Sequence, residues 1–121
     1  MAASTYDFID DNAFEQGATL ARRFIWQDSA GVPVNLLGYT ARMQVRKNVI
    51  DPTVLLSLTT ENAGIVLGGS AGTIDLAATA TQMAALTWRT GVYDLELIAA
   101  DGTVTRLLSG SVEMSPEVTR G

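Results

Sequence analysis

Residues Gly91–Leu108 have the sequence GVYDLELIAADGTVTRLL, in which two alternating runs meet at Asp101-Gly102. Side chains alternate along a strand, so Tyr93, Leu95 and Leu97 would share one face and the acids between them the other. An Asp-Gly pair between two such runs is a strong hairpin signal, because the tightest hairpin turns need positive φ. The segment therefore predicts an antiparallel hairpin with one buried face.

Similar runs occur along most of the chain. Tyr39–Lys47 alternates cleanly: Tyr39, Ala41, Met43 and Val45 would face a core, and the polar residues between them would face outward. The glycine-rich stretch from residue 68 to residue 72 is expected at a hairpin tip. Further strands are predicted at Ala18–Gln27, Val54–Thr59, Ile65–Leu67, Thr73–Leu76 and Ser111–Met114, the last after an interruption at Gly110.

One segment has a different composition. Thr79–Trp88 is rich in alanine, which favours helix, and the threonine at position 79 or 81 could cap its start. We expect one short helix of two to three turns, with Met83, Leu86 and Ala84 on its buried stripe.

These elements together predict an all-β fold. Seven or eight short strands with one inserted helix are typical of an immunoglobulin-like antiparallel β-sandwich, and a small barrel is the alternative. The 121 residues fit a single domain. We expect the sandwich to span residues 18–116, with a short polar tail over residues 117–121. Residues 1–17 would be an N-terminal arm or the first strand of the domain.

Charge and composition narrow the function. The chain has 8 basic and 13 acidic side chains, a formal net charge of -5, so we expect it to bind neither nucleic acid nor an anionic membrane surface. Residues 1–11 contain no basic n-region, and no apolar run approaches the ~20 residues of a membrane helix, so no signal peptide or membrane span is expected. Only 17% of residues are charged and 47% are hydrophobic, which suggests that part of the surface is normally covered.

The sequence offers little chemistry for catalysis. It contains neither histidine nor cysteine, the commonest general base and the usual thiol nucleophile. The glycine run is followed by Thr73 and a strand pattern, whereas a phosphate-binding P-loop needs Lys-Ser/Thr and a helix. Asp10 and Asp11 lack the spacing of a calcium loop and are interpreted as a polar lead-in to the first strand. We predict that the protein is not an enzyme and has no cofactor or metal site.

A second pair of carboxylates lies within a predicted strand. Asp94 and Glu96 would project from the same face of one strand. They could act as a glycosidase pair only with a sugar-binding cleft between them and another element. A cross-strand charge ladder with Arg42 or Arg46 on a neighbouring strand is the preferred interpretation.

The N-terminal segment is apolar for an exposed arm. It contains the run Tyr6–Ile9, then Phe14, and two positions later Gln16. Such an arm could dock on a neighbouring protein, by adding a strand to a sheet edge or by packing in a groove. It could equally be the first strand of this domain.

The order of the segments resembles a known family. FEQGATLARRFIWQDSAGVPVNLLGYTARMQVRK (residues 14–47) is followed by GTIDLAATATQMAAL (72–86), GVYDLEL (91–97) and ADGTVTRLLSGSVEMSPEVTR (100–120). This succession is similar to the N-terminal domain of upper baseplate proteins of tailed phages and to related small phage virion structural proteins. Larger members of the family continue into a coiled-coil or receptor-binding part, so we expect this chain to be a stand-alone module.

The resemblance implies a β-sandwich that forms rings or trimers and attaches fibre or receptor-binding proteins to the virion. We therefore expect a homo-oligomer, a trimer or hexamer, that is assembled in the host cytoplasm and contacts other virion proteins. A capsid decoration or head–tail connector protein is one alternative. A carbohydrate-binding module is another, which exposure of Trp26 or Trp88 would favour. The residues predicted to contact partners are Tyr6, Phe8, Ile9, Phe14, Gln16, Arg42, Arg46, Asp94 and Glu96.

Overall fold

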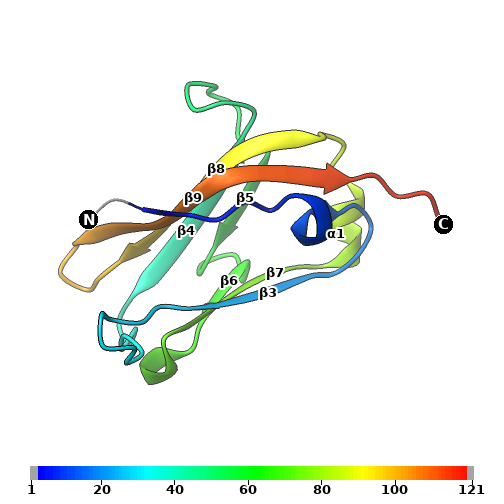
Figure 1. The fold of residues 1–121 in the computed structure, drawn as a ribbon. Helices are drawn as coiled ribbons and strands as arrows, with labels where there is room; N and C mark the ends of the chain where they lie inside the picture. Colours follow the sequence, from blue (N-terminus) through cyan, green and yellow to red (C-terminus); the bar gives the residue numbers. More distant parts are fainter. Residues whose placement is uncertain (1–2, 120–121) are drawn as a thin grey trace.

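Two β-sheets pack face to face in the computed structural model, which describes residues 3–119 (Figure 1). The larger sheet has the strand order β1-β9-β8-β4-β5, and β2 also pairs with β9. Its strands are β1 (Ser4–Thr5), β2 (Phe14–Glu15), β4 (Thr40–Arg46), β5 (Leu56–Thr59), β8 (Thr90–Ile98) and β9 (Val104–Ser115). The smaller sheet has the order β3-β7-β6, formed by β3 (Leu20–Ile25), β6 (Ile65–Leu67) and β7 (Thr73–Ala78).

This arrangement confirms the immunoglobulin-like sandwich. The order β9-β8-β4-β5 corresponds to strands G, F, C and C′ of that fold, and β3-β7-β6 corresponds to B, E and D. Both predicted hairpins are present: β8 and β9 pair antiparallel across the Asp-Gly turn, and β6 and β7 pair antiparallel across the short 3-10 turn η2 (Gly69–Ala71). The two sheets are separate, so the fold is not a closed barrel.

The core lies between the sheets and follows the predicted alternation. Ala41, Met43 and Val45 of β4 and the alternate residues of β8 are buried, while the residues between them face outward. The inner face of the smaller sheet supplies Leu20, Ile65, Ile74, Leu76 and Ala78. Tyr39 lies at the margin of this core, half-buried and edge-to-face with Trp26.

The helix is shorter than predicted. α1 spans Ala80–Ala84, a little more than one turn, and Thr79 caps it in a capping box with Gln82. Met83 is fully buried as expected, and Leu86, just beyond the helix, packs against the core. The prediction for Ala84 is wrong, because its side chain is exposed. A single turn has too few positions to bury a stripe of three residues.

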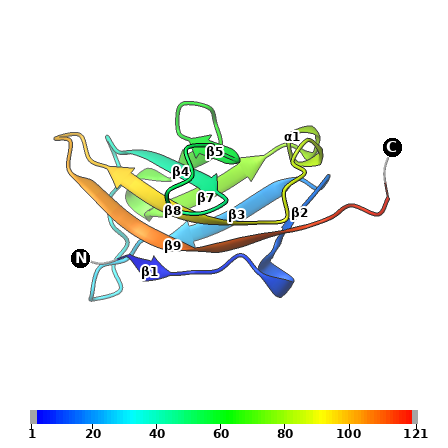
Figure 2. The same ribbon diagram turned by 90° about the horizontal axis from the view of Figure 1, so that it is seen from above.

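The N-terminal segment belongs to the same sandwich. It runs along β9 in parallel, through β1, an isolated bridge between Phe8 and Val112, and β2, with the 3-10 turn η1 (Asp10–Asn12) between the last two (Figure 2). Residues 3–17 are therefore the first strand region of this domain, interrupted and parallel. These parallel pairings are a departure from the wholly antiparallel sandwich that the sequence predicts.

Gly110 does not interrupt β9, contrary to the prediction. The strand is continuous over its 12 residues, with a bulge where it faces Leu95 and Glu96. A Cβ atom at position 110 would collide with the carbonyl oxygen of Tyr6 and lie 2.6 Å from Oδ1 of Asp7. The glycine thus allows the N-terminal segment to approach β9 closely. Its function is to make room for a neighbouring chain segment and not to end the strand.

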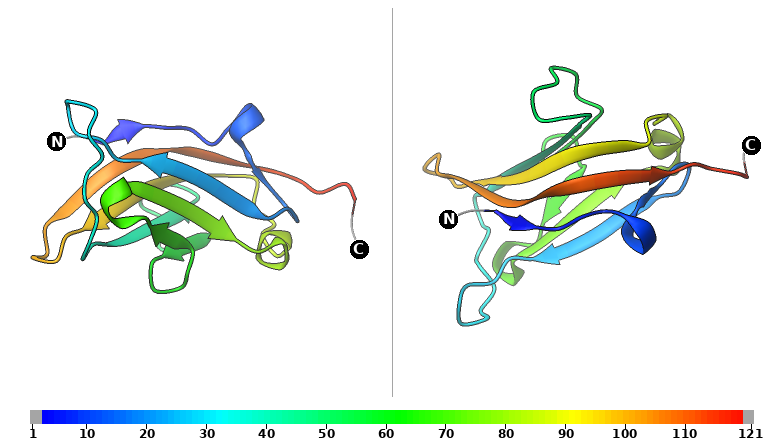
Figure 3. Two further views of the ribbon diagram at one scale, coloured as in Figure 1. Left: turned by 90° about the horizontal axis from the view of Figure 1, so that it is seen from below. Right: turned by 45° about the horizontal axis from the view of Figure 1, so that its top comes forward.

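Figure 3 shows the N-terminal segment alongside β9, where aromatic side chains fix it in place. Phe8 lies at ring-centroid distances of 4.8 Å from Phe14 and 5.0 Å from Tyr93. The Tyr93 hydroxyl donates a hydrogen bond of 2.6 Å to the carbonyl of Tyr6, and burial raises the pKa of this hydroxyl. Arg22 of β3 donates to the carbonyls of residues 12 and 13 and lies over both phenylalanine rings. The segment is joined to both sheets of its own domain.

Candidate functional site

The outer face of β4, β8 and β9 carries the predicted charge ladder. Arg42 and Glu96 are register partners on β4 and β8, and Nε of Arg42 lies 2.8 Å from Oε1 of Glu96. On the other side of β8, Nε of Arg106 lies 3.4 Å from Oδ2 of Asp94. The predicted cross-strand charge ladder is therefore confirmed for the pair Glu96–Arg42. Asp94 pairs instead with Arg106 of β9.

Arg46 has a different partner from the one expected. Its guanidinium donates to the carbonyl of Asp51 at 2.7 Å and to Oε1 of Gln44 at 2.8 Å. The side chain therefore holds the base of the loop between β4 and β5 and does not pair with Asp94. In register Arg46 faces Val92, and it is Gln44 that faces Asp94.

Asp94 is the less well-paired of the two acids on β8, because its ion pair is 3.4 Å long and that of Glu96 is 2.8 Å long. Its partial burial, and then the nearby Glu96, raise the pKa of its carboxyl above the ordinary value, while Arg106 acts in the opposite direction. The ionised form is thus disfavoured in the folded protein relative to an exposed aspartate.

Asp94 and Glu96 do not oppose each other across a cleft. Both acids project from one strand and line an open depression of about 720 Å³, together with Asp7, Arg106 and residues 109–111 of β9. Glycoside hydrolysis needs two carboxyl groups on opposite sides of the bond that is cleaved. The face is a paired polar surface.

The predicted contact residues of the N-terminal segment lie within the domain. Phe8 and Phe14 are fully buried in its core, so the interpretation of these rings as contacts for a partner is corrected. Tyr6 is half-buried and packs against the core, and Ile9 is also half-buried. The Gln16 side chain donates to the carbonyl of Leu86 at 2.9 Å and accepts from the backbone N–H of residue 117 at 3.0 Å. It therefore closes the end of the sandwich.

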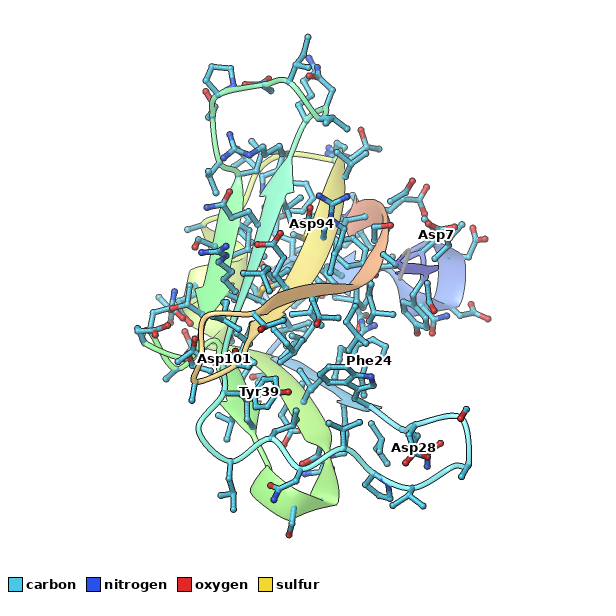
Figure 4. The ribbon with its side chains drawn as sticks, turned by 90° about the vertical axis from the view of Figure 1, so that its left-hand side faces the viewer. Asp7, Phe24, Asp28, Tyr39, Asp94 and Asp101 are labelled. Atoms are coloured by element: carbon cyan, nitrogen blue, oxygen red, sulfur yellow. The ribbon has the colours of Figure 1, made fainter. Side chains whose placement is uncertain are left out.

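The most exposed apolar side chains of the strand connections lie on a loop that the sequence reasoning did not select. We call residues 47–55, between β4 and β5, the projecting loop, because it extends beyond both sheets (Figures 1 and 4). Val49 is 84% exposed and Ile50 is 91% exposed. The sequence did contain a signal: two adjacent β-branched aliphatic residues directly before the Asp51-Pro52 break, where turn chemistry favours polar residues.

A second apolar group lies at the opposite end of the molecule. The loop between β3 and β4 (residues 26–39) exposes Val32 by 56% and Leu37 by 71%. The Asp28 side chain organises this loop by accepting hydrogen bonds from the backbone N–H groups of Ala30 and Val32. Figure 4 shows Asp28 at the end of the molecule opposite the projecting loop. We call residues 26–39, with the adjacent β8–β9 turn (residues 99–103), the acidic end.

The outer edge of β5 is covered by a side chain. Oδ1 of Asn62 accepts from the backbone N–H groups of Thr59 and Gly64, and its Nδ2 donates to the carbonyl of Ser57. The amide thus takes the place of a neighbouring strand, which protects an edge that could otherwise pair with another chain. Next to it is an apolar groove of about 500 Å³ formed partly by Leu56 and Leu58.

Other candidate sites receive no support. Within residues 3–119, no group of three acidic, histidine or cysteine side chains could hold a metal ion. In the same part of the chain, no helix is long and apolar enough to cross a bilayer. Trp26 and Trp88 are partly buried and pack against the core, so they give no support to sugar binding. Compared with known proteins, the chain matches no family model and no curated protein.

Proposed function

We propose that this chain is a structural protein of a tailed-phage virion, an oligomeric tail or baseplate adaptor that attaches fibre or receptor-binding proteins. The observation that carries the proposal is the projecting loop, in which Val49 and Ile50 are almost fully exposed. Adjacent exposed aliphatic residues at the tip of a projecting loop are typical of a surface that another protein covers. The proposed action is thus binding by burial of apolar surface.

The broad face of the larger sheet is less suited to binding a partner than the projecting loop is. On the broad face of the larger sheet, the carboxylates of β8 already have arginine partners within the chain. Exposed ion pairs of this kind contribute little to stability or affinity. The loops are therefore the surfaces that gain most from contact with a partner.

The resemblance to the phage family supports the virion assignment specifically. It concerns the order of segments between residues 14 and 120, and the immunoglobulin-like strand order is compatible with it. A capsid decoration or head–tail connector protein would use the same kind of loop contact at a different place in the particle.

Immunogold electron microscopy of purified particles, with an antibody against this chain, tests the proposal. We expect label on the tail or baseplate. Label on the head or at the head–tail junction would replace the tail assignment by one of the two alternatives, and unlabelled particles would contradict a virion role.

A matched pair of variants then tests the projecting loop itself. Val49→Asp/Ile50→Asp should reduce incorporation of the chain into particles, whereas Val118→Asp should not. Val118 is 90% exposed but lies outside the loop, so it controls for the loss of an exposed aliphatic residue. Equal incorporation of both variants would remove the loop from the proposal.

A further inference from the structure

We propose that Arg46 is a positioning residue, which holds the tip of the projecting loop in its contact shape before a partner arrives. This inference rests on the proposed function and concerns how the same loop is prepared for binding. It is carried by the hydrogen bonds that join the Arg46 side chain to the loop on one side and to β4 on the other.

The tip of the projecting loop (Figures 1 and 4) is a turn of residues 48–51, closed by a hydrogen bond of 3.2 Å from the N–H of Asp51 to the carbonyl of Asn48. Its two central residues are Val49 and Ile50. Turns favour Gly, Pro, Asn, Asp and Ser at such positions, whereas β-branched side chains favour extended backbone. The local sequence therefore does not favour the turn, and contacts outside it must hold its shape.

Several contacts of this kind surround Asp51, the last residue of the turn. Arg46 donates to the carbonyl of Asp51 at 2.7 Å and to Oε1 of Gln44 at 2.8 Å. Oδ1 of Asp51 accepts from the N–H of Thr53 at 2.9 Å. The N–H of Leu55 donates to a carbonyl of β4 at 2.7 Å, where the chain returns to the sheet. Arg46 thus ties the end of the turn to strand β4.

The guanidinium of Arg46 suits this role. It presents its N–H groups in a rigid fork, so it can bond two acceptors at once with little loss of freedom. Because both hydrogen bonds are made within the chain, we expect Arg46 to act on a partner through the loop and not by direct contact. The loop of the acidic end differs, since the side chain of Asp28 organises it from within.

Order in the free loop favours binding. A tip that is ordered before contact loses less conformational freedom on association. If the contact shape is present in only a fraction of molecules, the affinity falls by that fraction. Two hydrogen bonds together shift the equilibrium between the held and the loose loop by roughly 5-fold to 100-fold. Loss of both should leave Val49 and Ile50 exposed but poorly positioned.

NMR relaxation of the backbone amides of the full-length chain tests the positioning step without a partner. Arg46→Met retains the aliphatic stem and removes both donors. Arg42→Met is the matched control, because Arg42 also projects outward from β4 but pairs with Glu96. Tip order parameters should be about 0.85 in the wild type and the control, and below about 0.6 in Arg46→Met. A loose tip in the wild type, or equal order in the two variants, would overturn the inference.

Competition for incorporation into particles tests the effect on binding. Wild type and one variant are produced together during infection by a phage that lacks its own copy, and mass spectrometry compares their ratio in purified particles with that in the cell. Arg46→Met should be depleted by about threefold or more, and Arg42→Met should not be. Arg46→Lys keeps the charge but lacks the fork, so its depletion should follow the order of its tip.

Two results would overturn the positioning role of Arg46. One is incorporation of Arg46→Met equal to that of Arg42→Met despite a loose tip. The other is full incorporation of Arg46→Lys with a loose tip, which would indicate direct contact through the charge. Failure of the proposed function has a different signature: Val49→Asp/Ile50→Asp would enter particles as well as Val118→Asp does, whatever the order of the tip.

Discussion

Replacement of Phe8 by alanine should strongly destabilise the domain, because this residue joins the N-terminal segment to the core. Its side chain is fully buried, with ring centroids 4.8 Å from Phe14 and 5.0 Å from both Tyr6 and Tyr93. Arg22 also lies over the ring, 6.0 Å from its centroid.

The expected loss follows from the packing. Phe→Ala in a core costs about 3–5 kcal/mol, because the transfer free energy is lost and the surrounding side chains cannot fill the cavity. Domains of this size have a free energy of unfolding of about 5–15 kcal/mol, so the change removes a large fraction of it. At roughly 3–6 °C per kcal/mol, the melting temperature should fall by about 10–30 °C.

Urea unfolding followed by tryptophan fluorescence and thermal unfolding followed by circular dichroism would both measure this loss. Ile9→Ala is the matched control, because Ile9 is the next residue on the same segment but is partly exposed. The control should cost about 1 kcal/mol or less. If Phe8→Ala cost no more than Ile9→Ala, the segment would not be docked in the core of its own chain, and our account of the sandwich would be refuted.

Three further predictions concern single side chains. Asn62→Ala should lower the free energy of unfolding by about 1–2 kcal/mol and increase aggregation on heating, because it uncovers the edge of β5. Asn48→Ala should change neither. Equal light scattering from the two variants on heating would refute the role of Asn62 at the edge. Gly110→Ala should cost about 1–3 kcal/mol in urea unfolding, because the added methyl group collides with the N-terminal segment, and Ser111→Ala should cost little. Asp94→Asn should raise the melting temperature at about pH 7 but not at about pH 3. Because the pKa of Asp94 is raised in the folded protein, its ionised form disfavours the fold above that pKa, and this penalty disappears once the carboxyl is protonated. A lower melting temperature of the variant at neutral pH would contradict this prediction.

The strands with strict alternation were predictable from sequence. In β4 and β8 the apolar residues recur at every second position, and a one-residue shift would expose the whole buried set. The Asp-Gly turn fixed the register of β8 and β9 locally. The charge pair between Arg42 and Glu96 then followed from the antiparallel neighbourhood of the two strands.

The features that sequence could not predict depend on contacts between distant segments. Gly110 has the local character of a strand break, and only the passage of Tyr6 and Asp7 across it explains its presence within β9. Likewise, Phe8 and Phe14 suit either docking on a partner or packing in their own core, and the choice depends on Arg22 and Tyr93 from other strands. Local patterns contain no information on such partners.

The projecting loop was not among the residues predicted to contact partners. The predicted contact residues were chosen for charge or aromatic character, and most of them have partners inside the domain. Exposure of Val49 and Ile50 depends on how far the projecting loop extends beyond the sheets, which is a property of the folded chain.

The central claim is that another protein covers the projecting loop. A cryo-electron-microscopy map of the intact particle that contains this chain tests it most directly. The account predicts protein density packed against Val49 and Ile50 in the assembled state. A map in which both side chains face open solvent in every copy would contradict it.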